Sequence, residues 1–424
     1  MRDQRQFREI ILAGVAMTLI FTMVRVVSAD DFGQWRGPNR DGISQERGLL
    51  QSWPENGPRL LWKISDAGQG YSTPAVVDGR LYTLGSSDVK DEFVQARNAR
   101  SGELIWSRRI GKVGKPKQNP NYAGARSTPT VDGEFLYVLG SDGDLVCLTK
   151  ADGKVKWSKN LLTDFGGKSG TWAYSESPLI DGDAVVCTPG GTEATLLALN
   201  KSTGDVLWKC PQKEGDEAAY SSIIIVAAAG TRQYVQLLQK GLVGVEAKTG
   251  RFLWRYGRPI SPFNANIPTP VAGDGYVYTA SAGKGGGAVK LVQQADGVAA
   301  EHLYFETKLP TAIGGTIKLG ELLYGTTKQA MMCLEIATGK VLWSERAIGA
   351  ASMIYADGRF YLHGENGTVA LMEPSDKGYL QHGRFTPSGR PQKKGDMKSW
   401  AYPVVADGRL FIRDWDTIWC YQVK

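Results

Sequence analysis

The sequence predicts an all-β fold, an eight-bladed β-propeller of four-stranded antiparallel blades, and three observations lead to it. A short segment ending in tryptophan recurs at Trp106, Trp157, Trp208 and Trp254, at spacings of 51, 51 and 46 residues. Asp-Gly pairs, which suit the tight turns of β-hairpins, recur between β-rich runs. The chain also has 52 glycines among 424 residues, which indicates many turns. Repeats of roughly this length are typical of solenoids, propellers and arrays.

One complete unit shows the pattern of a blade. A first β-rich run, Ser127 to Val131, meets a second across Asp132-Gly133. Leu145 to Leu148 is a third run, and Val155 to Trp157 is a fourth, reached through the turn Asp152-Gly153. Four short runs joined by tight turns predict a four-stranded antiparallel meander.

Eight units of this kind follow one another, although not all are regular. The fifth ends in His302 to Glu306 in place of a tryptophan run, the seventh has Tyr379 to His382 there, and the fourth is also irregular. The eighth is short, because the chain ends after its third run, Thr417 to Tyr421. The units begin near Tyr71, Arg126, Tyr174, Tyr220, Asn266, Thr311, Ala350 and Ala401.

The missing fourth run of the last unit is present at the other end of the propeller sequence. Arg59 to Ile64, "RLLWKI", has the pattern of a fourth run, but no run precedes it with which it could pair. We expect strand 59–64 to pair with the C-terminal blade and close the ring, which leaves no open sheet edge between first and last blades. The recurrent tryptophan is expected to fill the space between neighbouring blades, where each buried ring contributes about 2 to 3 kcal/mol.

The N-terminus has the pattern of an export signal. Three arginines precede an apolar run from Ile10 to Val24, and Val27-Ser28-Ala29 is a small-residue cleavage site. The run is short for a bilayer span. We therefore expect a signal peptide at 1–29, a periplasmic or secreted mature protein beginning at Asp30, and no transmembrane span after cleavage. An uncleaved membrane anchor is the alternative, because Arg25 interrupts the signal just before the cut.

The rest of the chain divides into an arm and the propeller. Residues 30–58 are rich in glycine and proline and contain "GQWRGPNRDG". We expect this arm to lie across the propeller, 59–424, and to carry Trp35 and Trp53 with it. The formal net charge is +7, and no dense basic patch with interleaved aromatic residues is present. This argues against nucleic-acid binding.

The repeat resembles that of a known family. The segments "LLALNKSTGDVLW" (Leu196 to Trp208) and "MCLEIATGKVLW" (Met332 to Trp343) resemble the pyrroloquinoline-quinone (PQQ) repeat, and the resemblance covers Arg59 to Lys424. It implies an eight-bladed propeller. The same repeat builds the quinoprotein dehydrogenases and the non-catalytic outer-membrane assembly lipoprotein BamB. The arm segment "QWRGPNRDG" resembles that of secreted bacterial PQQ-like propellers.

The resemblance also implies cofactor landmarks, which can be sought in the sequence. A quinoprotein dehydrogenase should show a vicinal Cys-Cys pair and a Glu, Asn and Asp cluster for calcium, but the chain has no Cys-Cys pair and no C-x-x-C-H haem motif. We therefore expect no cofactor and no metal. In the alternative, a PQQ-dependent dehydrogenase, PQQ and calcium would bind, with Glu176 and Asn266 as possible calcium ligands and Trp172 as the stacking floor.

A candidate ligand site lies where the chain leads into each first strand, because innermost strands line the centre of a propeller and ligands bind at its mouth. Several aromatic rings, one Arg and one Glu facing one funnel would suit a flat or sugar-like ligand. The alternative is that these residues only pack the mouth. They are Tyr71, Arg126, Trp172, Tyr174, Glu176, Tyr220, Asn264, Asn266, Trp400 and Tyr402.

The sequence therefore predicts a non-catalytic extracytoplasmic scaffold or ligand-binding PQQ-like propeller. Its partner would be an envelope protein or a carbohydrate, and we expect a monomer. Two alternatives remain open, namely a PQQ-dependent dehydrogenase of alcohols or sugars and a polysaccharide-binding module that uses the aromatic rim.

Overall fold

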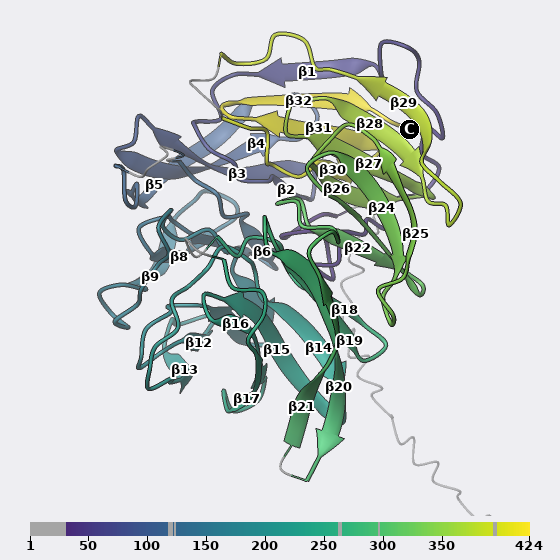
Figure 1. Ribbon diagram of the computed structural model, residues 1–424. Helices are drawn as coiled ribbons and strands as arrows, with labels where there is room; N and C mark the ends of the chain where they lie inside the picture. The colour runs from purple at the N-terminus through teal and green to yellow at the C-terminus, as the bar shows by residue number, and fades with distance from the viewer. Residues whose placement is uncertain (1–30, 118–121, 123, 262–264, 296, 393–396) are drawn as a thin grey trace, which may run out of the picture.

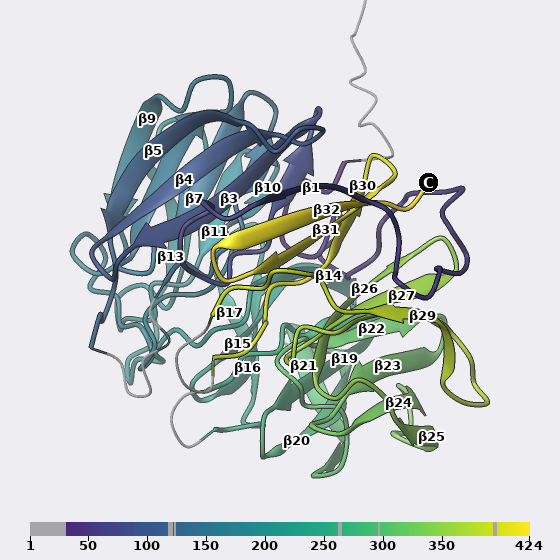
Figure 2. The same ribbon diagram turned by 90° about the horizontal axis from the view of Figure 1, so that it is seen from above.

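The computed structural model describes residues 31–424 apart from 118–121, 123, 262–264, 296 and 393–396. The described chain forms eight four-stranded sheets arranged in a ring (Figure 1). In Figures 1 and 2 the C-terminal strands β31 (Arg409–Asp414) and β32 (Thr417–Gln422) lie beside the N-terminal strand β1 (Leu60–Ile64). The predicted all-β fold, an eight-bladed β-propeller, is confirmed.

The first four blades are continuous antiparallel meanders. Blade 1 contains β2 (Ala75–Val77), β3 (Arg80–Ser87), β4 (Asp91–Asn98) and β5 (Leu104–Lys112). Blade 2 contains β6 (Thr130–Asp132), β7 (Phe135–Leu139), β8 (Asp144–Thr149) and β9 (Val155–Asn160). Blade 3 contains β10 (Leu179–Asp181), β11 (Ala184–Cys187), β12 (Leu196–Asn200) and β13 (Val206–Cys210). Blade 4 contains β14 (Ile224–Ala228), β15 (Thr231–Leu238), β16 (Gly241–Glu246) and β17 (Phe252–Tyr256).

The next three blades are built in the same way, and the eighth is shared between the two ends of the propeller. Blade 5 contains β18 (Val271–Gly273), β19 (Tyr276–Ser281), β20 (Gly285–Gln294) and β21 (Gly297–Glu306). Blade 6 contains β22 (Thr316–Leu319), β23 (Leu322–Thr326), β24 (Ala330–Glu335) and β25 (Val341–Arg346). Blade 7 contains β26 (Ala351–Ala356), β27 (Arg359–Gly364), β28 (Val369–Glu373) and β29 (Leu380–Phe385). Blade 8 contains β30 (Val404–Ala406), β31, β32 and β1.

The ring closes through the N-terminal strand of the propeller. Strand β1 pairs antiparallel with β32, and Trp62 lies opposite Cys420 while Ile64 lies opposite Ile418. The backbone N–H of Gln422 donates to the carbonyl of Arg59 at 2.9 Å. The predicted closure by residues 59–64 is therefore confirmed.

The recurrent tryptophans of blades 1, 2, 3 and 8 each contact a glycine turn in the next blade. A Cβ atom added to Gly153 in blade 2 would lie 2.7 Å from the ring of Trp106 in blade 1, and one added to Gly204 would lie 3.0 Å from the ring of Trp157. The indole N–H of Trp106 also donates to the carbonyl of Lys150 in blade 2 at 3.2 Å. The glycine of the repeat thus leaves room for the tryptophan of the preceding blade.

Blade 5 makes the same junction without a tryptophan. The hydroxyl of Tyr304 in β21 donates to the carbonyl of Ile336 in blade 6 at 2.8 Å. A Cβ atom on Gly339 would lie 2.7 Å from the Tyr304 ring. A tyrosine in the irregular fifth unit therefore occupies the place of the indole.

Blade 7 receives its missing tryptophan from the arm. Gly383 occupies the position of the recurrent tryptophan and pairs with Leu371 of the third strand. A Cβ atom on Gly383 would lie 2.7 Å from Cβ of Trp53 and 3.0 Å from its ring. The backbone N–H of Trp53 donates to the carbonyl of His382 at 3.0 Å. The side chain of Trp53 is buried. An arm residue thus fills the space that an outer-strand tryptophan fills elsewhere.

The segments that lead into the first strands are tied together by hydroxyl groups. The backbone N–H of Thr128 donates to Oγ of Ser177 at 2.9 Å, and that of Ser177 donates to Oγ of Ser222 at 3.0 Å. Across the closure, the N–H of Tyr402 donates to Oγ1 of Thr73 at 2.9 Å. These buried bonds join neighbouring blades just before their first strands, and so fix the segments that carry the predicted mouth residues.

Candidate functional site

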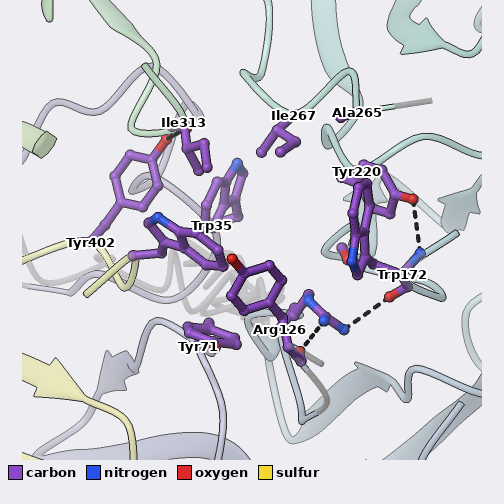
Figure 3. A pocket seen from close by; sticks show the side chains of 12 residues that line it. Trp35, Tyr71, Arg126, Trp172, Tyr220, Ala265, Ile267, Ile313 and Tyr402 are labelled. Atoms are coloured by element: carbon purple, nitrogen blue, oxygen red, sulfur yellow. Dashed lines mark hydrogen bonds between the residues drawn. The ribbon is translucent and has the colours of Figure 1, made fainter. Parts of the chain in front are cut away.

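A cavity of about 280 Å³ lies where the chain leads into the first strands (Figure 3). This volume is just below the range of about 300 to 1,000 Å³ that is usual for small-molecule sites. Seven aromatic side chains dominate its wall, with three aliphatic residues, one serine and one arginine. The lining residues are Trp35, Tyr71, Tyr122, Arg126, Trp172, Ser175, Tyr220, Ala265, Ile267, Ile313, Trp400 and Tyr402.

The structure brings six of the ten predicted residues together on this wall, namely Tyr71, Arg126, Trp172, Tyr220, Trp400 and Tyr402. Three others do not line the cavity and are buried elsewhere. Tyr174 donates its hydroxyl to the carbonyl of Pro189 at 2.7 Å. Glu176 and Asn266 hydrogen-bond inside the blades, as described below. The tenth, Asn264, lies outside the described residues.

Six lining residues were not among those predicted: Trp35, Tyr122, Ser175, Ala265, Ile267 and Ile313. Ser175, Ala265 and Ile267 are chain neighbours of predicted residues, so position alone could have indicated them. Trp35 comes from the arm, and Tyr122 comes from the connection between blades 1 and 2. No repeat position marks these two, because both segments stand outside the meander pattern.

The aromatic rings of the wall contact one another in pairs. Trp35 meets Tyr402 edge to face with ring centroids 4.6 Å apart, and Tyr71 lies 4.9 Å from Trp400. On the opposite side Trp172 lies 5.8 Å from Tyr220, and its backbone N–H donates to the Tyr220 hydroxyl at 2.9 Å (Figure 3). Such contacts contribute about 0.5 to 1.5 kcal/mol each beyond area burial. The wall is therefore held in place before any ligand binds.

Arg126 is the cation of the described lining, and its guanidinium is engaged by the protein. Its Nη1 donates to the carbonyl of Trp172 at 2.9 Å, and its Nη2 donates to the carbonyl of Tyr122. The guanidinium carbon also lies 5.8 Å from the ring centroid of Tyr71. Burial lowers the pKa of Arg126, while Tyr71 and Glu92 oppose this shift. Arg126 therefore holds the wall together as much as it offers charge.

The arm closes the end of the ring that lies away from the mouth. Its hydrogen bonds lie near the far ends of first strands. The backbone N–H of Phe32 donates to the carbonyl of Val76 at 2.8 Å, and the N–H of Val76 donates to the carbonyl of Phe32 at 2.9 Å. The N–H of Ser44 donates to the carbonyl of Tyr355 at 2.8 Å. Between these points the guanidinium of Arg40 donates to the carbonyl of Ser177 in blade 3 at 2.8 Å. The cavity is thus closed at that end by the arm.

Within the arm, Trp35 and Arg36 reach the central residues of other blades. The indole N–H of Trp35 donates to Oγ1 of Thr269 in blade 5 at 3.0 Å. Arg36 is fully buried and donates to the carbonyl of Thr316 in blade 6 at 2.5 Å. Its guanidinium lies 5.8 Å from the ring centroid of Tyr402. Trp35 of the arm therefore forms part of the cavity wall, and its hydrogen bond to Thr269 fixes the position of its ring.

Two lining hydroxyls have no hydrogen-bond partner in the described part of the chain. Oη of Tyr71 and Oγ of Ser175 are buried and have no hydrogen-bond partner among the residues that the structure describes. A buried polar group left without a partner costs about 1 to 3 kcal/mol. Such groups in a cavity wall are suited to meet a polar atom of a ligand.

Of the two residues proposed as calcium ligands, Glu176 has both carboxylate oxygens engaged by the protein. Oδ1 of Asn266, the atom that would bind calcium, has no hydrogen-bond partner among the described residues. The carboxylate of Glu176 accepts the backbone N–H of Thr188 and, at 2.9 Å, the side-chain amide of Gln236. Burial raises the pKa of Glu176 to about 7, although these hydrogen bonds act in the opposite direction. The side-chain NH₂ of Asn266 donates to the carbonyl of Leu238 at 2.7 Å. A carboxylate that already accepts two N–H groups and favours its proton is a poor calcium ligand.

The described residues hold neither a candidate membrane span nor a candidate metal cluster. No helix long and apolar enough to cross a membrane was found in the described part of the chain. The same residues contain no group of three or more His, Cys, Asp or Glu side chains placed to hold a metal ion. The five cysteines are all described, buried and unpaired.

Comparison with known proteins gives relatives of several kinds. The dehydrogenase subunit of the quinone alcohol dehydrogenase of Komagataeibacter europaeus is 26% identical over 229 residues, which are 49% of this chain and 30% of that protein. Outer membrane protein assembly factor BamB of Shewanella oneidensis is 23% identical over 218 residues, which are 51% of this chain and 50% of that protein. The chain thus spans about a third to a half of the length of these relatives.

A solved structure shares the fold over nearly its whole length. BamB from Moraxella catarrhalis superposes with a TM-score of 0.59 at 14% identity, covering 86% of this chain and 97% of that one. The family model described as outer membrane protein assembly factor BamB matches residues 90–345 and 285–416. Because these ranges cover most of the eight-bladed ring, this chain belongs to the family of PQQ-like propellers described as outer membrane protein assembly factor BamB.

Proposed function

We propose that this protein is a non-catalytic, extracytoplasmic propeller that binds a ligand or a partner protein at the aromatic mouth of its ring. The observation that carries the proposal is the composition of the cavity wall, in which seven aromatic rings surround one arginine. Aromatic and aliphatic walls with a few polar groups are typical of binding sites. The described wall presents no carboxylate, imidazole or thiol that could act as an acid, base or nucleophile.

The chemistry of the wall argues against the rival reading, a PQQ-dependent dehydrogenase. PQQ carries three carboxylates on a flat ring, so its binding requires several cationic or calcium contacts in one place. The described wall supplies Arg126, whose N–H groups already donate to backbone carbonyls. Glu176 accepts two N–H groups from the protein and does not line the cavity. These residues fit calcium-bound PQQ poorly.

The proposals of export and of an envelope partner rest on the sequence and its relatives rather than on the cavity. The signal-like segment 1–29 lies outside the described residues, and it supports export to the periplasm or beyond. Relatives named as outer membrane protein assembly factors support an envelope protein as partner. A carbohydrate partner at the same aromatic rim is the second possibility, and we expect the protein to act as a monomer.

Reconstitution tests the proposal directly. Purified protein is heated with PQQ and calcium, and dye-linked oxidation of alcohols and aldoses is assayed alongside. The proposal predicts no rise of the melting temperature and no oxidation. A rise of several degrees that disappears in Trp172→Ala or Arg126→Ala would overturn it and establish the dehydrogenase reading. The same melting assay with oligosaccharides tests the carbohydrate partner, and affinity capture from cell envelopes searches for a protein one.

A further inference from the structure

The cavity has a shape that limits what can enter it. The arm closes the end of the ring away from the mouth, with Phe32 bonded to blade 1, Arg40 to blade 3 and Ser44 to blade 7. Trp35 of the same arm forms part of the wall. A chain cannot therefore be threaded through the ring. The volume of about 280 Å³ suits one ring system rather than an extended polymer.

The wall has the chemistry of a site for an uncharged ring. Its aromatic residues offer faces and edges for ring stacking, and Ala265, Ile267 and Ile313 add aliphatic surface. A sugar would bring several hydroxyl groups, each of which needs a polar partner when it leaves water. An anion would have to compete with backbone carbonyls for the N–H groups of Arg126. Both of these ligand classes match the wall less well than a neutral aromatic ring.

The wall also offers a ligand two hydroxyl groups for hydrogen bonding. Oη of Tyr71 and Oγ of Ser175 lack partners among the described residues, and both residues line the cavity. A hydroxyl can donate one hydrogen bond and accept others. A ligand with a single hydroxyl or N–H group on its ring could therefore satisfy one or both of them, which would remove the cost of leaving them unpaired.

We propose that the cavity binds a single neutral aromatic ring that carries one hydrogen-bonding group, with the chemistry of a phenol or an indole. The ring stacks between the Trp172 and Tyr220 side and the Tyr71 and Trp400 side, and its polar group meets Tyr71 or Ser175. This inference rests on the proposed function, since it names the ligand class of the same site. The ring has two possible sources, an aromatic side chain of a partner protein and a free small molecule.

Calorimetric titration of the full chain tests the ligand class. The probes are p-cresol and indole, with 4-hydroxybenzoate as the charged counterpart of p-cresol. We expect one site for p-cresol and for indole, with a Kd on the order of 1 mM or tighter, and weaker binding of 4-hydroxybenzoate. No heat with either neutral probe would overturn the inference, as would tighter binding of 4-hydroxybenzoate. Neither result would by itself contradict the proposed function, which the PQQ assay tests separately.

Variants locate the site. Tyr71→Phe removes only a hydroxyl without a described partner, so the fold should be kept while p-cresol binds about three- to tenfold more weakly. Tyr361→Phe is the matched control, because the Tyr361 hydroxyl is also buried without a described partner but lies outside the cavity. Trp172→Ala should abolish binding of both probes. Equal binding to wild type and Trp172→Ala would overturn the proposal.

The two sources of the ring are separated by a fourth probe, N-acetyl-tyrosinamide, which carries the same phenol on a peptide backbone. Tighter binding than p-cresol indicates a side chain of a partner protein, because the backbone then adds contacts at the rim. Weaker binding indicates a free small molecule, because the backbone then obstructs entry. Competition with p-cresol is expected in both cases, and its absence would contradict a shared site.

Discussion

At the scale of single residues, the glycine in the outer turn of blades 1, 2, 3, 4 and 6 is fixed by a ring from the preceding blade. Gly153 has a φ of 69°, and a Cβ atom there would lie 2.7 Å from the ring of Trp106. The residue thus meets two demands at once, a left-handed backbone and room for an indole. This explains in physical terms why Gly and Trp recur together four positions apart.

A glycine substitution can separate these two demands. Gly153→Ala should destabilise the protein by the cost of the left-handed backbone, about 1 to 2 kcal/mol, plus about 1 to 3 kcal/mol for crowding Trp106. Gly182 has a φ of 58° and nothing within 4 Å of an added Cβ, so Gly182→Ala should pay the backbone cost alone. Urea midpoints of the two variants measure the difference. Equal midpoints would contradict the role of Gly153 in packing the tryptophan.

A buried carboxyl gives a second prediction at this scale. Glu92 accepts hydrogen bonds from Ser141 N–H and Oγ at 2.7 and 2.6 Å. Burial nonetheless raises its pKa from 4.5 to about 7. Between these values the folded state binds more protons than the unfolded state, so the stabilising contribution is full below about pH 4.5 and is lost as the pH rises through 7.

The melting temperature of wild type should therefore fall relative to that of Glu92→Gln as the pH is raised from 5 to 8. Gln keeps the shape of the side chain and cannot ionise. Glu301→Gln, which changes an exposed carboxylate, serves as the control and should follow wild type. A constant difference between wild type and Glu92→Gln across this range would show that Glu92 does not titrate there.

At the scale of elements, the blades show which parts of the fold are encoded locally. Hairpin turns, and in most units the outer-strand tryptophan, are encoded within the unit itself, so the sequence predicts eight four-stranded blades and the closing strand 59–64. The seventh unit was recognised as irregular, but its repair was not visible, because Trp53 and Gly383 are more than 300 residues apart in sequence. Only the folded arm brings them together.

Trp53 of the arm should therefore contribute to the free energy of unfolding as an outer-strand tryptophan does. Trp53→Ala empties the space over Gly383 and is expected to cost about 3 to 5 kcal/mol. Trp343→Ala, which removes the corresponding ring of blade 6, should cost a similar amount, and Trp172→Ala, at the partly exposed mouth, should cost less. Urea unfolding of the three variants compares them. A Trp53→Ala variant as stable as wild type would show that the arm only rests on blade 7.

At the scale of the whole molecule, the ring determines how much of the site could be predicted. Repeat position located the segments that converge on the mouth, and six of ten predicted residues do line the cavity. Position could not give side-chain direction, since Glu176 turns toward Thr188, which follows β11, and toward Gln236 of β15. Nor could it place Trp35, whose location depends on how the arm crosses the ring. Local pattern encodes the ring, whereas contacts distant in sequence complete the site.

Ring closure carries the last prediction. Strand β1 is the outer strand of blade 8, and its removal would expose the edge of β32 and the core around Trp419, which is fully buried. Because consecutive blades pack in a circle, an open ring loses the support of its first and last blades together. Deletion of residues 59–64 should therefore abolish the single cooperative melting transition. Leu60→Ser, in the same strand but 42% exposed, is the control and should melt close to wild type. A deletion variant that melts like wild type would contradict closure by this strand.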